Sequence, residues 1–181
     1  MFAFVLVRLE ENFMISLIVA ADRNWAIGNS GKLLTSIPDD LRFFRQTTRD
    51  KVVIMGRKTV ESLPGGRPLP NRVTILITRD PDFKMDGVTI VHSIEEALKE
   101  AEKYKTEIYV AGGGEIYTQM LDLCDEALVT YIDYSYQADS FIPNLDKRPE
   151  WVLAAESEEQ THFDIVYYFR QYIRRKDYID Q

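Results

Sequence analysis

Short, nearly continuous apolar runs recur along the chain and predict buried β-strands. Runs of this length without polar alternation are typical of strands that are covered on both faces of a sheet. Six of them occupy residues 15–21, 51–55, 73–78, 88–91, 108–111 and 127–132. Their spacing leaves room for a helix or a loop after each strand.

Helical signals fill several of these gaps. Pro38 suits the first position of a helix, and Asp39 and Asp40 favour the positive end of a helix dipole, so a helix is predicted from Pro38. Ser93 and Glu96 form a capping box ahead of an amphipathic helix that runs to about residue 104. Two shorter helices are predicted at 57–63 and 115–123.

The order of these elements predicts the fold class. Strands alternate with helices until two late strands, near 151–156 and 164–174, follow each other directly and are expected to pair antiparallel. We expect a single α/β domain, with a mostly parallel twisted sheet of about eight strands, an antiparallel C-terminal edge and helices on both faces. Residues 14–176 should form this domain, 1–13 an extension outside the fold, and 177–181 a short tail.

Composition narrows the class of protein. The chain has 181 residues, 45% of them hydrophobic, which is enough for one domain with a sizeable core. No run approaches the roughly eighteen apolar residues of a membrane span, and no export signal is evident, so we expect a cytoplasmic protein without a membrane partner. Cys124 is the single cysteine, and neither of the two histidines has a neighbour at metal-ligand spacing. No metal site is predicted.

Charge is distributed unevenly. The net charge of −7 argues against nucleic acid as a general partner. Residues 42–84, however, contain ten basic and four acidic side chains, a balance of +6 that leaves −13 for the rest. A basic middle in an acidic chain indicates a local site for a small anion, with a merely solvated face as the alternative.

Candidate chemistry begins in the stretch from Ile27 to Phe44. It opens as a loop that contains Gly28 and Gly31 and continues into the helix that carries Asp40. Asp40 and Phe44 are four residues apart and share a mostly apolar helix face. Acids at helix starts are most often dipole partners. One carboxylate on an apolar face, beside a glycine-hinged loop, can also hold a proton-handling group over a flat ligand.

Two strand–glycine–helix junctions are candidate phosphate sites. Gly56 is followed by Arg57 and Lys58, and the triple glycine 112–114 follows the strand at 108–111. In a parallel sheet both junctions fall at the carboxyl ends of strands, where ligands bind. Glycine lets the backbone approach a phosphate without a collision of Cβ. Either junction alone could be no more than a tight turn, but two together favour a phosphorylated cofactor.

The ordered set of motifs resembles the bacterial dihydrofolate reductases. It comprises Ile15-Ser16-Leu17-Ile18-Val19-Ala20-Ala21, Ile27-Gly28, Ile37-Pro38-Asp39-Asp40-Leu41, Val53-Ile54-Met55-Gly56-Arg57-Lys58-Thr59, Leu69-Pro70-Asn71-Arg72, Ala111-Gly112-Gly113-Gly114-Glu115-Ile116-Tyr117 and Asp139-Ser140-Phe141-Ile142-Pro143. The resemblance extends from about Met14 to Arg174. It implies that NADPH reduces 7,8-dihydrofolate to tetrahydrofolate for one-carbon metabolism, by hydride transfer to the pterin C6 and proton addition at N5.

The resemblance also implies roles for residues around the substrate. Asp40 would bond the pterin and promote protonation, supported by Thr130, and Arg72 would pair with the α-carboxylate of the folate glutamate. The expected catalytic set is Asp40, Thr130, Leu33 and Thr35, and the other expected substrate contacts are Ile18, Ala20, Leu41, Phe44 and Leu63.

The implied cofactor is NADPH. Four residues, Arg57, Lys58, Thr78 and Arg79, match positions that meet the adenosine 2′-phosphate in the family. The pyrophosphate would be held by Thr59, Gly113, Gly114 and Ile116, and the nicotinamide would lie near Ala21, Ile27 and Ala111. The remaining expected cofactor-binding residues are Gly28, Gly56, Gly112, Glu115 and Tyr117. A cis peptide is expected at Gly112-Gly113, as in family members.

The chain departs from the family beside the expected chemistry. Residues 24–37 match a mobile loop that closes over the nicotinamide, and many relatives have Pro-Trp where Leu34-Thr35 stand here. Thr35 could hold a water with its hydroxyl but cannot supply the tryptophan ring. This affects the expected proton route and the affinity of antifolate inhibitors. Glu115 is a second departure, since some relatives carry a basic residue there.

Two other functions stay open from the sequence. One is another reductase of the same fold, of the riboflavin-pathway pyrimidine reductase type. The helix start at Asp40 and the presence of Arg72 both argue against it. The other is a catalytically silent nucleotide-binding protein. Loss of Asp40 or of the triple glycine would have favoured this alternative, but both are present. The expected partner is a small-molecule substrate, and the expected state is a monomer.

Overall fold

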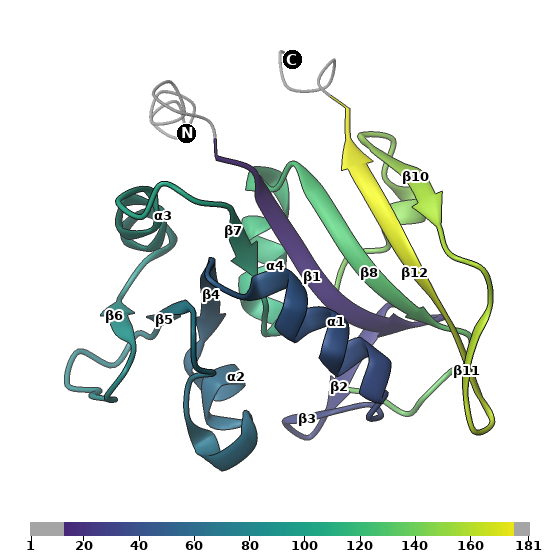
Figure 1. Cartoon of the computed structure of the whole chain (residues 1–181), viewed down its shortest axis with the longest axis horizontal. Coiled ribbons are helices and arrows are strands. Elements are labelled where there is room, and N and C mark those ends of the chain that lie inside the picture. The colour runs from purple at the N-terminus through teal and green to yellow at the C-terminus, as the bar shows by residue number, and fades with distance from the viewer. Residues whose placement is uncertain (1–12, 176–181) are drawn as a thin grey trace.

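A twisted central sheet organises the molecule, which we describe from a computed structural model for residues 13–175. The sheet runs in the order β10-β12-β8-β1-β7-β4-β5-β6, with β11 paired to β12 (Figure 1). Its strands are β1 (Ile15–Asp22), β4 (Val52–Gly56), β5 (Val73–Ile77), β6 (Thr89–Val91), β7 (Ile108–Val110), β8 (Glu126–Ile132), β10 (Trp151–Glu156), β11 (Gln160–His162) and β12 (Ile165–Arg174). All pairings from β8 to β6 are parallel, and β12 pairs antiparallel with both β8 and β10. The predicted fold class and antiparallel edge are confirmed.

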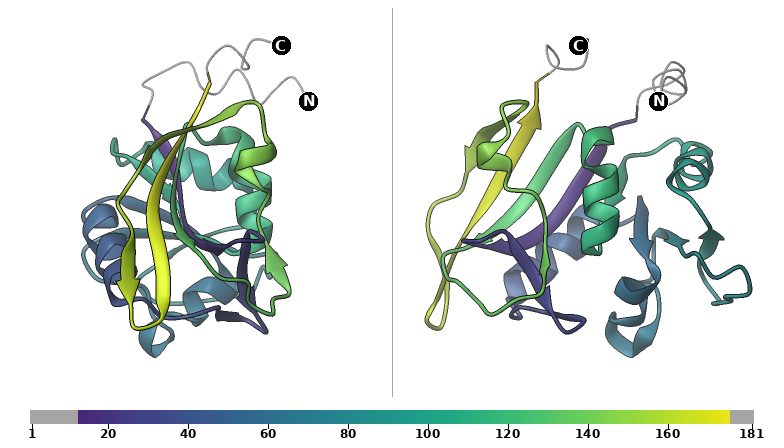
Figure 2. Two further views of the ribbon diagram at one scale, coloured as in Figure 1. Left: turned by 90° about the vertical axis from the view of Figure 1, so that its right-hand side faces the viewer. Right: turned by 180° about the vertical axis from the view of Figure 1, so that it is seen from behind.

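Helices cover both faces of the sheet. They are α1 (Pro38–Thr48), α2 (Arg57–Glu61), α3 (Ile94–Glu102) and α4 (Gly114–Met120). Side chains of α3 and α4 join the larger apolar cluster on one face, whereas Val60 of α2 and Phe44 of α1 pack with β4 side chains on the other. The two views of Figure 2 show α1 and α4 on opposite sides of the sheet.

Several predicted boundaries were wrong by one to three residues. The strand expected at 51–55 lies at Val52–Gly56, because Gly56 still pairs with Ile77 of β5. The helix expected at 57–63 ends at Glu61, and Ser62 closes its last turn by donating its hydroxyl to the Thr59 carbonyl over 2.7 Å. The helix expected at 115–123 is α4 followed by a separate 3₁₀ turn, Leu121–Leu123. The capping helix starts as expected but ends at Glu102, and the last strand starts at Ile165.

A second, small sheet was not predicted. The segment 24–37, expected to be a loop, contains β2 (Ala26–Asn29) and β3 (Lys32–Leu33), and β2 also pairs with β9 (Ser140–Phe141). These strands have two to four residues each, too few for a period to be visible in the sequence. The predicted extension 1–13 and the tail 177–181 lie outside the described residues, apart from Phe13. No described helix is long and apolar enough to span a bilayer.

Asp22 ties the small sheet to the large one. Its carboxylate is fully buried at the end of β1 and accepts three backbone N–H groups, from Asn24 (2.8 Å), Ala26 (3.0 Å) and Tyr136 (2.8 Å). Two of these donors share Oδ1, and Tyr136 binds Oδ2. Buried N–H groups that lose their acceptor carry the full cost of desolvation. Asp22 is therefore a positioning residue for the turn into β2.

We expect Asp22→Asn to lower the free energy of unfolding by about 2 kcal/mol, because the amide nitrogen of asparagine would face the N–H of Tyr136 or of both other donors. Urea unfolding with an unchanged m-value would measure it. Asp139→Asn is the matched control, since the exposed Asp139 accepts the N–H of Ser30 at 2.9 Å and its loss should change stability little. Equal effects of the two substitutions would contradict the role given to Asp22.

Candidate active site

A carboxylate and a hydroxyl from distant parts of the chain form the centre of the site. Asp40 lies in the first turn of α1, and Thr130 lies in the middle of β8. The Thr130 hydroxyl donates to Asp40 Oδ1 over 2.6 Å. Burial raises the pKa of Asp40, and the hydrogen bond from Thr130 acts in the opposite direction. Asp40 is thus a single carboxyl group in a largely apolar environment, with the Thr130 hydroxyl as its hydrogen-bond donor. A carboxyl group in such an environment can exchange a proton with a nearby ligand.

A small pocket opens beside this pair. Six of the predicted site residues line it together, namely Ala20, Ile27, Leu33, Thr35, Asp40 and Leu41, with Leu34, Ile37 and Ile132 as additional lining residues. Sequence reasoning missed Ile37 and Ile132 as lining residues. Ile132 could have been predicted from the sequence, because it lies two residues beyond Thr130 on the same strand and therefore on the same face.

Apolar side chains continue the wall of the site away from Asp40. Phe44 and Leu63 both pack against the cluster formed by β4, α2 and β5, and Ala111 packs there as well. Ile18 is buried in β1, and its carbonyl accepts the hydroxyl of Tyr117 over 2.7 Å. Burial, with a smaller contribution from Asp40, raises the pKa of Tyr117, so its phenol remains protonated as a donor.

Arg72 lies in a separate groove beyond these walls. The groove is lined by Arg45, Gln46, Arg49, Pro64, Leu69, Pro70, Asn71 and Arg72. Arg72 donates Nη2 to the carbonyl of Arg45 over 3.2 Å, while its buried Nε has no partner among the described residues. Burial and the neighbouring charge of Arg45 lower the pKa of Arg72. A desolvated guanidinium with an unused donor is suited to a carboxylate ligand.

The two glycine junctions meet at adjacent strands. β4 pairs with β7, and the N–H of Gly56 donates to the carbonyl of Gly112 over 2.7 Å. The Gly112-Gly113 peptide is cis, as expected. A Cβ placed on Gly113 would lie 3.2 Å from Thr59 Oγ1, so a larger residue there would require the Thr59 side chain to shift. Neither α2 nor α4 has a side-chain cap on its first N–H groups. Together the two junctions form a backbone cradle whose uncapped N–H groups are of the kind that binds a phosphate group.

Gly112→Ala should reduce the free energy of unfolding by about 2–3 kcal/mol, as expected for a strained backbone conformation. Gly112 has φ +112, which L-residues avoid, and a Cβ there would lie 3.2 Å from the ring of Tyr117. Thermal unfolding would be compared with Gly65→Ala, where φ is +71 but no atom lies within 4 Å of an added Cβ. A smaller effect at 112 than at 65 would show that the crowding is unimportant.

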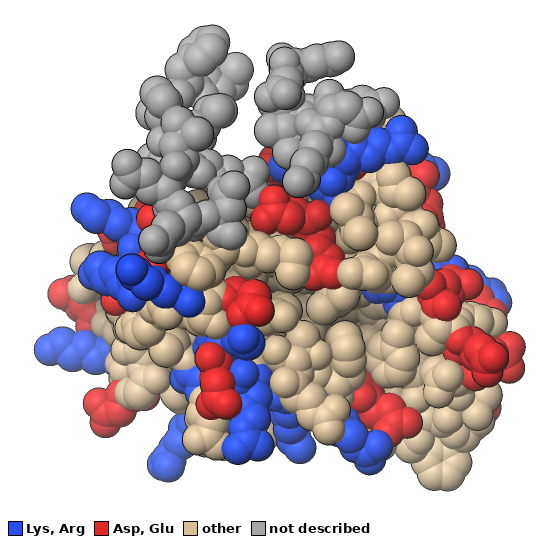
Figure 3. Space-filling view, turned by 45° about the horizontal axis from the view of Figure 1, so that its top comes forward, with Lys and Arg blue, Asp and Glu red and all other residues tan. Residues whose placement is uncertain are grey.

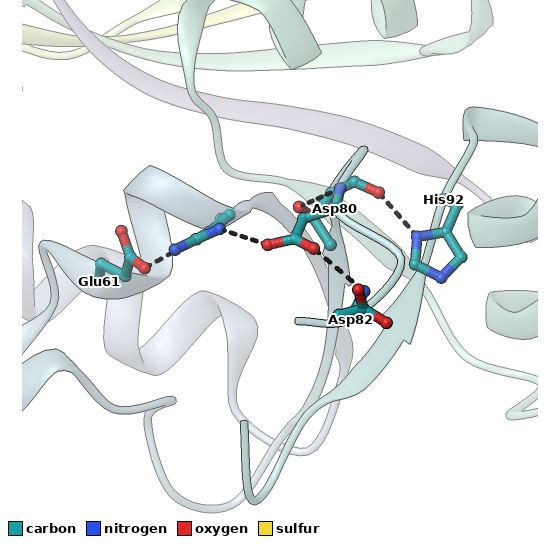
Figure 4. A network of polar contacts seen from close by, with 6 residues as sticks. Glu61, Asp80, Asp82 and His92 are labelled. Atoms are coloured by element: carbon teal, nitrogen blue, oxygen red, sulfur yellow. Dashed lines mark hydrogen bonds and ion pairs between the residues drawn. The ribbon is translucent and has the colours of Figure 1, made fainter. Parts of the chain in front are cut away.

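The predicted 2′-phosphate residues gather at the ends of β4 and β5. Arg57 is ion-paired with Glu61 and Asp80, and Arg79 Nη2 lies 3.3 Å from Glu115. Thr78 accepts the N–H of Asp80 over 3.2 Å, and its carbonyl contacts His92 Nδ1 at 2.8 Å (Figure 4). Lys58 is exposed. Of these acidic partners of the two arginines, only Glu115 was anticipated from the sequence, and Glu61 and Asp80 were missed. In Figure 3 basic and acidic side chains are interspersed over the visible face.

Comparison with known proteins assigns the chain to a family. A family model described as dihydrofolate reductase matches residues 14–174. The chain belongs to the dihydrofolate reductase family. Dihydrofolate reductase of Bacillus subtilis is 37% identical over 145 residues, 80% of this chain and 84% of that protein. The type A13 dihydrofolate reductase of Escherichia coli is 32% identical over 165 residues, 91% and 97% of the two chains.

A solved dihydrofolate reductase shares the fold closely. The enzyme of Enterococcus faecalis, complexed with NADP(H) and RAB-propyl, superposes with a TM-score of 0.82 at 33% identity and covers 90% of this chain and 97% of its own. Within this dihydrofolate reductase fold, the chain carries Leu34 and Thr35 at the pocket beside Asp40. The structure therefore places the residues that depart from the family's Pro-Trp pattern directly at the candidate site.

Proposed function

We propose that this member of the dihydrofolate reductase family reduces 7,8-dihydrofolate to 5,6,7,8-tetrahydrofolate with NADPH and so supplies one-carbon metabolism. The observation that carries the proposal is the partly buried Asp40–Thr130 pair, 2.6 Å apart, in a small apolar-walled pocket. NADPH, when bound, supplies the hydride that pterin C6 receives. The chain's own residues bind and orient the ligands, exclude water and handle the proton.

Asp40 is the proposed proton-handling residue. Its carboxylate accepts hydrogen bonds from the pterin 2-amino and N3 groups and promotes protonation at N5, directly or through a water. The Thr130 hydroxyl fixes the orientation of Asp40 by donating to Oδ1. Leu33 and Thr35 line the same pocket and cover the reacting atoms. The Thr35 hydroxyl holds the water that a tryptophan helps to position in other members of the family.

The apolar walls and the arginine groove suit an extended ligand. Ile18, Ala20, Leu41, Phe44 and Leu63 are the proposed contacts of the flat rings. Arg72, with its unused buried Nε, is the proposed partner of the glutamate α-carboxylate. Separation of the Asp40 pocket from the Arg72 groove supports this assignment, because the pterin and the glutamate are opposite ends of one molecule.

We assign the glycine cradle to the cofactor. Thr59, Gly113, Gly114 and Ile116 would hold the pyrophosphate, and Gly56 with Gly112 fixes the approach of the two junctions. Ala21, Ile27, Gly28 and Ala111 would border the nicotinamide, while Arg57, Lys58, Thr78 and Arg79 would meet the 2′-phosphate. Tyr117 would support the cradle through its ring, which lies beside Gly112. Its hydroxyl does not contribute, because it donates to the carbonyl of Ile18.

The decisive experiment is the oxidation of NADPH followed by absorbance, with and without dihydrofolate. Oxidation that depends on dihydrofolate is expected, and its absence would refute the proposal. A ribityl pyrimidine substrate is the control for the riboflavin-pathway alternative, which the family match does not favour. We also propose a cytoplasmic monomer that antifolates inhibit. Sizing chromatography would test the monomer.

A further inference from the structure

Arg57 is held by two carboxylates at the point where a cofactor phosphate is expected. Its Nε donates to Glu61 Oε1 over 2.9 Å, and its Nη1 donates to Asp80 Oδ2 over 3.2 Å. The guanidinium carbon also lies 4.3 Å from the ring centroid of Phe83. Figure 4 shows the network running from Glu61 through Asp80 to Asp82.

These contacts engage one nitrogen of each forked edge of the guanidinium. An arginine binds a phosphate bidentately through either Nε with Nη2 or Nη1 with Nη2. Glu61 already takes Nε from the first edge, and Asp80 takes Nη1 from the second. A phosphate that approaches either edge of Arg57 therefore meets a carboxylate that is already bonded to one of the two nitrogens of that edge.

The two carboxylates are held differently. Asp80 is built into a turn, because its Oδ1 accepts the N–H of Asp82 over 3.0 Å and its own N–H donates to Thr78 Oγ1. Glu61 contacts Arg57 from one turn farther along α2, and the side chains of Glu61 and Asp80 are 44% and 45% exposed. An exposed pair of this kind contributes little and can be exchanged. Arg79 has an acidic partner too, Glu115, so the acids offset the positive charge of both arginines.

We propose that Glu61 and Asp80 determine cofactor specificity by competing with the 2′-phosphate for Arg57. The inference rests on the proposed function, which places a dinucleotide in the glycine cradle. It adds that this chain binds phosphorylated dinucleotides less tightly than its arginines would allow. Removal of either carboxylate should strengthen binding of NADPH and leave NADH, which lacks the 2′-phosphate, unaffected.

The test is Glu61→Gln in the full chain, with the fluorescence of NADPH and of NADH titrated in the absence of substrate. Glutamine keeps an oxygen that can accept from Arg57 Nε but removes the charge. We expect the Kd for NADPH to fall about two- to fivefold at low salt, and the gain to shrink at 1 M salt because exposed charges are screened. The Kd for NADH should be unchanged.

Glu100→Gln is the matched control, since Glu100 of α3 pairs with Lys103, the residue just after the helix, and its loss changes the net charge equally. Neither Kd should change in it. Asp80→Asn is the second variant, because asparagine can still accept the N–H of Asp82 and preserve the turn. It should act in the same direction as Glu61→Gln.

Three results would overturn the inference. Weaker binding of NADPH in Glu61→Gln would show that Glu61 positions Arg57 for the phosphate. Equal changes for NADPH and NADH would indicate a structural effect. Unchanged Kd values in both variants would show that the carboxylates do not compete. A wild-type chain that binds neither dinucleotide would instead remove the proposed function together with this inference.

Discussion

Asp40→Asn is expected to lower kcat/KM for dihydrofolate at neutral pH by about 100-fold or more, the scale of a lost general acid–base group. Asparagine matches the size of the side chain and can still accept the Thr130 hydroxyl, but it cannot promote protonation of the pterin. Activity should recover partly in acid, where the substrate is protonated without help. The measurement is the pH dependence of kcat/KM for wild type and variant between roughly pH 5 and 8.

Asp39→Asn provides the control for charge. Asp39 occupies the neighbouring position of α1 but is half exposed, pairs with Arg42 at 3.0 Å and accepts the Tyr167 hydroxyl at 3.3 Å. Its loss removes the same charge from the same helix turn and should leave the pH profile unchanged. Similar losses in both variants would mean that the charge at the helix start, and not the buried carboxyl, sustains the reaction.

A stability measurement separates the loss of catalysis from misfolding. Burial raises the pKa of Asp40 above its value in the unfolded chain. The folded state therefore favours the protonated form, and stability is lost as pH rises from the ordinary aspartate range through the raised pKa. Asp40→Asn removes this loss, so the variant should be at least as stable as wild type at neutral pH. A less stable variant would contradict the stated cost of burial.

Arg72→Leu is expected to raise the KM for dihydrofolate about 10- to 100-fold with a small change in kcat, the effect of losing a charge-assisted, forked hydrogen bond that binds ground and transition states alike. Arg72→Lys should fall between leucine and wild type, because lysine keeps the charge without the fork. Steady-state kinetics would be run with dihydrofolate and with a dihydropterin that lacks the glutamate.

The truncated substrate makes this prediction specific. If Arg72 binds the glutamate α-carboxylate, wild type and Arg72→Leu should use the dihydropterin equally well. Arg67→Leu is the matched control in the same loop, where Arg67 is exposed, and should change neither KM. An equal loss on both substrates in Arg72→Leu would show that Arg72 supports the fold, through its bond to the Arg45 carbonyl, rather than the ligand.

The sequence by itself determined the large elements and their order. Runs such as 15–21 and 127–132 form buried strands because covering both faces of a parallel sheet requires continuous apolar side chains. Pro38 and the following acids predict the start of α1, and Ser93 predicts that of α3, since these signals act within one helical turn. The glycine junctions were also placed correctly at the strand ends, where an added Cβ on Gly56 or Gly113 would crowd the side chain of Ile116 or Thr59.

Only the tertiary structure decided which groups meet. Thr130 donates to Asp40 across 90 residues of chain, a pairing that the family resemblance implied but no local pattern predicts, and the strands β2, β3 and β9 are too short to have a period of their own. Local patterns hold no record of such contacts, because the register between distant strands is set by the packing of the whole sheet. The acidic partners of Arg57 illustrate the same limit. Glu61 is one helical turn away and could be anticipated, whereas Asp80 reaches Arg57 only because β5 lies beside β4.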